Sequence, residues 1–99
     1  MATQKYVTKT VTKLNDATDW ISPRHDAPIP GLDMSIQEES AFVGTIALQK
    51  RRGASGAIKT VETYTEDEEA RIDDPVAGVQ YRLICTAYTS GQCVLELYR

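Results

Sequence analysis

The chain has 99 residues, of which 41% are hydrophobic and 25% charged; this composition is typical of one globular domain and excludes disordered and fibrous proteins. The formal net charge of −3 excludes the strongly basic balance of many nucleic-acid-binding proteins, and no segment reaches the ~20 apolar residues that cross a bilayer. We therefore expect residues 1–99 to form a single domain that binds neither membranes nor nucleic acids. Because residues 1–7 lack the apolar segment of a secretory signal, we expect synthesis in the cytoplasm.

The first third of the chain combines one strand pattern with a proline-rich segment. Eleven Thr, seven Val and seven Ile stand against six Leu, which favours strands throughout because β-branched side chains suit a pleated surface. Residues 5–14 alternate and predict a strand, and residues 1–14 could also serve as an arm in contacts between subunits. A short apolar run at residues 20–21 precedes three prolines within residues 22–31, a segment that predicts a loop.

Alternation continues through the rest of the chain. Residues 32–37 predict a half-buried strand, and residues 41–50 and 58–65 predict a hairpin joined by a basic, glycine-containing turn. Residues 66–69 are acidic and predict an exposed loop. Residues 79–88 and 92–98 predict two final strands separated by a turn at 89–91. Six to eight antiparallel strands indicate an all-β fold with two packed sheets, a jelly-roll-like β-sandwich.

Few residues have the chemistry of a catalytic or metal site. His25 is the one histidine, and it lies in the proline-rich segment, so no nucleophile–base pair can be assembled around it. Cys85 and Cys93 with His25 fall short of the ligand set that zinc requires. We therefore expect no metal, no cofactor and no enzymatic activity. The two cysteines lie on the expected inner face of the last two strands, where they would pack as small apolar side chains or, alternatively, form a disulfide.

Basic and proline-rich segments are the candidates for contacts with a partner. The lysines of the first strand and the prolines of the loop are poorly explained by a core, and cations cluster at the hairpin tip. The candidate interface residues are Lys9, Lys13, Trp20, Pro28, Pro30, Lys50, Arg51 and Arg52. The acidic residues 66–69 could receive the basic cluster from another copy of the chain. Alternatively, several tyrosines on one exposed face would form a platform for sugars.

Two stretches resemble small structural proteins encoded in the genomes of tailed bacteriophages. Residues 42–51, Phe-Val-Gly-Thr-Ile-Ala-Leu-Gln-Lys-Arg, resemble a strand of those proteins that leads into a hairpin, and residues 74–83 with 88–91 resemble their C-terminal part. The resemblance implies a β-sandwich component of the virion, most simply a head decoration (cement) protein that bridges capsid subunits. Its implied partners are the major capsid protein or another virion protein and further copies of itself, for instance in a trimer. A tail-associated or carbohydrate-binding module is the alternative.

Overall fold

The computed structural model describes residues 6–23, 31–73 and 78–99, and these residues form an all-β fold without helices. All strand pairs are antiparallel and belong to one sheet. The five strands are β1 (Tyr6–Val11), β2 (Leu32–Arg52), β3 (Lys59–Tyr64), β4 (Glu68–Ile72) and β5 (Val79–Tyr98). The described part of the chain contains no helix that is long and apolar enough to cross a membrane.

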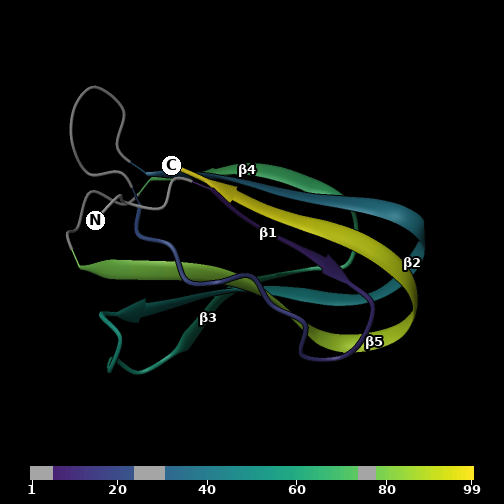
Figure 1. The fold of residues 1–99 in the computed structure, drawn as a ribbon, viewed down its shortest axis with the longest axis horizontal. Helices are drawn as coiled ribbons and strands as arrows, with labels where there is room; N and C mark the ends of the chain where they lie inside the picture. Colours follow the sequence, from purple (N-terminus) through teal and green to yellow (C-terminus); the bar gives the residue numbers. More distant parts are fainter. Residues whose placement is uncertain (1–5, 24–30, 74–77) are drawn as a thin grey trace.

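The two long strands, β2 and β5, pair along almost their whole length and bend together (Figure 1). In the first half of the sheet, the start of β2 lies between β4 and the end of β5, which in turn pairs with β1. In the second half, the end of β2 lies between β3 and the start of β5. Isolated bridges from Ala17 and Ile21 extend this second half beyond β5. The bend brings the inner faces of the two halves together.

Irregular pairing around Gly91 accompanies the bend. The register between β2 and β5 shifts four times between Glu38 and Ile46. Gly91 has a φ of 82°, a conformation that residues with a Cβ atom rarely adopt, and a Cβ atom there would lie 2.3 Å from the carbonyl oxygen of Ser40. Shifts of this kind are β-bulges, which increase the local bending of a strand. The chain therefore bends at Gly91 and continues as the same strand.

The core fills the space between the two halves of the sheet. Its buried side chains come mainly from alternate positions of β2 and β5, as the predicted alternation requires. The core comprises Val7, Val11, Ile21, Leu32, Met34, Ile36, Ile46, Leu48, Val79, Tyr81, Leu83, Cys85, Cys93, Leu95 and Leu97. Both cysteines are free and buried, so they pack in the core and do not form the alternative disulfide. Burial, followed by proximity to Cys85, raises the pKa of Cys93 to about 12.

Three predictions about the strands need correction. The described residues form one sheet of five strands and not two sheets of six to eight, because the segments predicted as 32–37 and 41–50 are both parts of β2. The predicted turn at 89–91 lies inside β5, since a glycine with positive φ serves a bulge as well as a turn. The predicted loop at 66–69 ends early, because β4 begins at Glu68 and pairs with β2.

Candidate interaction surfaces

The bent sheet has two outer faces, because every second side chain of β2 and β5 points away from the core. One outer face belongs to the half that contains β1, β4, the start of β2 and the end of β5. The other belongs to the half that contains β3, the end of β2 and the start of β5. Since the core lies between the halves, the two outer faces point in opposite directions (Figure 1).

The second outer face carries two arginines held side by side, and we call it the arginine face: Trp20, Gln49, Arg51, Gln80 and Arg82. Pairing of β2 with β5 places Gln49 opposite Arg82, and Arg51 opposite Gln80. The Nε of Arg51 donates a hydrogen bond to Gln80 (2.8 Å), and the Nε of Arg82 donates one to Gln49 (3.0 Å). Both guanidinium groups lie over the ring of Trp20, at 4.1 and 4.6 Å from its centroid. The two cations are therefore held in fixed orientations.

Within the described residues, neither arginine of this face has a carboxylate partner. The ion pairs of these residues involve Asp16, Asp33 and Asp73, all away from Arg51 and Arg82. Burial, followed by the charge of Arg51, lowers the pKa of Arg82 below its ordinary value. A lowered pKa means that the site disfavours the charged form of Arg82. An anion bound beside the pair would offset the repulsion between the two guanidinium groups, and arginine pairs hydrogen-bond well to carboxylates and phosphates.

A basic hollow of about 630 Å³ adjoins the arginine face at the β2–β3 hairpin. Its charged lining residues are Lys50, Arg51, Arg52 and Lys59. The hairpin turns at Gly53, which has a φ of 64° and whose N–H donates a hydrogen bond to the carbonyl of Gly78 (2.7 Å). The hollow is therefore lined from both sides of the hairpin, because Arg51 points outward over Trp20 whereas Lys50 lies over the core ring of Tyr81.

The structure brings together only some of the candidate interface residues. Trp20 contacts Arg51, and Lys50 and Arg52 flank Arg51 on β2. Lys50 itself lies over the ring of Tyr81, 5.9 Å from its centroid. Pro28 and Pro30 lie outside the described residues.

Lys9 and Lys13 belong to a different place, the corner that follows β1. There the carboxylate of Asp16, only 7% exposed, accepts hydrogen bonds from the backbone N–H of Thr12 (2.9 Å) and from its hydroxyl (3.3 Å). Lys9 Nζ lies 4.0 Å from the same carboxylate. The Thr12 N–H is the largest cause that lowers the pKa of Asp16, and the charges of Lys9 and Lys13 act in the same direction. The charges of Lys9 and Lys13 therefore interact with a carboxylate of the same chain.

Replacing Asp16 by asparagine is expected to lower the free energy of unfolding by about 1 kcal/mol at pH 7, because a charged acceptor is lost from two hydrogen bonds. A carboxylate whose pKa is lower in the folded state stabilises the fold above its unfolded pKa of about 3.8, and this contribution is lost as the pH falls through the folded value. Urea unfolding from pH 7 to pH 2.5 should therefore show the difference between wild type and D16N shrinking below about pH 4. A difference that stays constant over this range would contradict the assignment.

Sequence reasoning missed Arg82 and both glutamines of the arginine face. Gln80 and Arg82 lie within the predicted strand 79–88, and nothing in that pattern marks either of them as an interface residue. No local pattern relates Arg82 to Arg51, which lies 31 positions away in the sequence. The pairing register of β2 with β5 is the signal that joins them.

The first outer face carries tyrosines and carboxylates, and we call it the tyrosine–carboxylate face: Tyr6, Asp33, Glu69, Glu96 and Tyr98. The rings of Tyr6 and Tyr98 lie 4.7 Å apart, and both hydroxyl groups donate hydrogen bonds to Oε2 of Glu96, at 2.7 and 3.0 Å. The hydrogen bond to Glu96 is the main reason why the pKa of Tyr98 rises to about 12. Both phenols are thus held as donors around one carboxylate.

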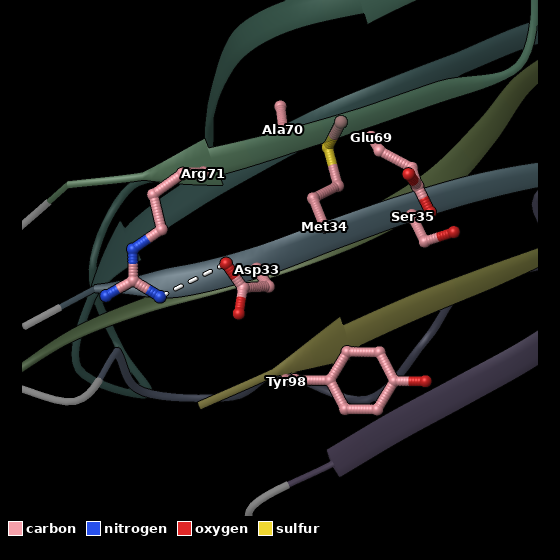
Figure 2. Close-up of a pocket in the computed structure, with 7 residues that line it drawn as sticks. All are labelled: Asp33, Met34, Ser35, Glu69, Ala70, Arg71 and Tyr98. Atoms are coloured by element: carbon pink, nitrogen blue, oxygen red, sulfur yellow. Dashed lines mark hydrogen bonds and ion pairs between the residues drawn. The ribbon is translucent and has the colours of Figure 1, made fainter. Parts of the chain in front are cut away.

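A hollow of about 380 Å³ lies on this face between β4 and the end of β5 (Figure 2). Asp33 and Arg71 form an ion pair of 3.1 Å at one side of the hollow, Glu69 and Ser35 lie further along it, and the ring of Tyr98 lines its edge. Among the residues that the structure describes, three carboxylates and one guanidinium leave this face with an excess of negative charge. This face is therefore opposite in sign to the arginine face.

No group of three or more His, Cys, Asp or Glu side chains that could hold a metal ion occurs within residues 6–23, 31–73 and 78–99. Searches of protein-family models, curated proteins and solved structures found no match to the chain. The two outer faces are therefore the features from which we infer a function.

Proposed function

We propose that the chain is a non-catalytic structural protein of a tailed-bacteriophage virion, namely a head decoration protein that binds the major capsid protein through its arginine face. Two features support this proposal: the resemblance of residues 42–51, 74–83 and 88–91 to phage structural proteins, and a preformed cationic surface. The bent sheet also provides two outward faces, as the sandwich of the resembled proteins would. A protein that bridges subunits needs contacts on more than one side.

The observation that carries the proposal is the pair of guanidinium groups held over Trp20 without a carboxylate partner in the described chain. Tryptophan and arginine are the residues most enriched among those that dominate binding energy at protein interfaces. Hydrogen bonds to Gln49 and Gln80 already orient both arginines, so less conformational entropy is lost when a partner binds. An acidic surface on an assembled capsid is the partner that this face fits.

Sedimentation with assembled shells of the phage that encodes the chain tests the proposal. The wild-type chain is expected to pellet with the shells in stoichiometric amounts. Arg51→Gln/Arg82→Gln removes both charges from the arginine face and is expected to weaken binding at least tenfold, since charge-assisted hydrogen bonds are lost. Lys13→Gln removes a charge from the corner that follows β1, which is the other candidate surface, and should bind like the wild type.

Two outcomes would count against this assignment. Equal loss of binding in Lys13→Gln would move the contact to the β1 corner. Wild-type protein that stays in the supernatant would contradict the decoration function. It would favour the alternative, a tail-associated or carbohydrate-binding module. A specific observation supports that second function: Tyr6 and Tyr98, 41% and 40% exposed, share one face with Glu96 and Asp33, a combination that can stack on and hydrogen-bond to a sugar.

A further inference from the structure

The charges of the folded sheet are sorted by face. The arginine face carries Arg51 and Arg82. The lysines of the neighbouring hairpin belong to the inner side of the sheet, because Lys50 pairs with the core residue Tyr81 and with Lys59. Among the described residues, the other outer face has the opposite balance, because Asp33, Glu69 and Glu96 outnumber the one neighbouring cation, Arg71. A net charge of −3 for the whole chain therefore conceals two surfaces of opposite sign.

We propose that the arginine face of one copy docks on the tyrosine–carboxylate face of a second copy. The inference rests on the arginine face being a docking surface, as in the proposed function, and names a second occupant of defined chemistry, with which the capsid protein competes for that face. Complementary surface charge guides association and sets the orientation of the partners. A second molecule of this protein carries the complementary surface, because its sequence is identical.

The side chains on the two faces have matching chemistry. The Nε atom of Arg82 is engaged with Gln49, whereas its two Nη groups have no partner among the described residues and are available to donate. The tyrosine–carboxylate face presents the carboxylate of Glu69 as an acceptor and the exposed ring of Tyr98 as a surface on which a guanidinium group can stack. The hollow of about 380 Å³ between them gives the incoming side chains a place to enter (Figure 2).

The positions of the two faces determine the kind of assembly. Because the two faces of a copy point in opposite directions (Figure 1), a two-fold symmetric dimer cannot bury both faces of each copy. The contact is heterologous, so the assembly keeps one free face of each sign at its two ends, and it closes into a ring or grows as a chain. On a capsid, a copy whose arginine face binds the capsid protein can still receive a further copy on its tyrosine–carboxylate face.

A charge exchange in the absence of shells tests the inference. Sedimentation velocity over a concentration series is expected to show wild-type self-association at ~0.01 M salt and its loss at ~0.5 M, because salt shortens the range of exposed charges. Arg51→Glu/Arg82→Glu makes both faces acidic, and Glu69→Lys/Glu96→Lys makes the receiving face basic. Each variant alone is expected to self-associate at least tenfold more weakly than the wild type. Their equimolar mixture is expected to regain mass, because opposite signs again meet at each contact.

Matched variants and the shell assay separate the possible failures. Lys13→Glu, Glu39→Lys and their mixture exchange charge outside both faces and should behave like the wild type. Circular dichroism of every variant establishes that it folds. A wild-type chain that remains monomeric at low salt, or a mixture that does not regain mass, overturns the inference. A monomer that still pellets with shells overturns the self-docking alone, whereas a self-associating chain that ignores shells overturns the decoration function alone.

Discussion

Truncating Leu95 to alanine is expected to lower the free energy of unfolding by about 2–5 kcal/mol, through the lost transfer of the side chain from water and the cavity left behind. Leu95 is fully buried and lies in the first half of the sheet, where β5 pairs it with Lys9 of β1 and with Ile36 of β2. Its neighbours belong to paired strands and can move little into the space. Since domains of this size have a total stability of about 5–15 kcal/mol, the loss is a large fraction of the whole.

Urea unfolding followed by circular dichroism measures this loss, and Leu14→Ala is the matched control. Leu14 is 51% exposed, so the same chemical change is expected to alter the free energy of unfolding by no more than about 0.5 kcal/mol. If both variants lost the same small amount, the core would not lie between the two halves of the sheet.

Replacing Gly91 by alanine is expected to cost about 2–5 kcal/mol, because two effects act at one position. A φ of 82° strains a residue with a Cβ atom by roughly 1–2 kcal/mol. In addition, the new Cβ atom would lie 2.3 Å from the carbonyl oxygen of Ser40 and 2.5 Å from that of Ala41, which forces the backbone of β2 to move, at a typical cost of about 1–3 kcal/mol. The bend of the sheet is expected to be the part that is disturbed.

Gly53→Ala separates the two effects. Gly53 also has a positive φ, of 64°, but no atom lies within 4 Å of a Cβ atom built there. This control is therefore expected to cost only the strain, about 1–2 kcal/mol. Thermal unfolding of both variants checks the difference. Equal costs at the two glycines would show that the close approach of β2 to Gly91 is unimportant for stability.

The bend at Gly91 also connects the fold to the proposed contacts. A flat sheet formed by the same ladder of β2 and β5 would carry Arg51, Arg82, Glu69 and Glu96 on one continuous face, because they all occupy outward positions. Bending turns this face into two that point apart, one basic and one acidic. The separation makes it possible for one copy to offer a cation surface and an anion surface to different neighbours.

Much of the core follows from the sequence, because the burial of alternate strand positions is a local property. The alternation in the predicted strands 32–37, 79–88 and 92–98 predicts buried side chains, including both cysteines, and the structure confirms it except at Ala87, which is exposed. The β2–β3 hairpin follows equally well, since a glycine-containing turn between two β-rich segments is a short-range signal. Local sequence patterns were enough to predict these features.

The number of sheets and the arginine face were decided by tertiary structure. Gly91 is compatible with both a turn and a bulge, and only the approach of Ser40 and Ala41 from β2 selects the bulge, so that β5 continues through the position at which a turn was predicted. Arg51 and Arg82 become neighbours only because β2 and β5 pair in one register, which depends on burial along both strands at once. The local alternation of apolar and polar residues is enough to predict most of the buried side chains, whereas the long-range pairing of β2 with β5 sets which polar residues meet on the surface.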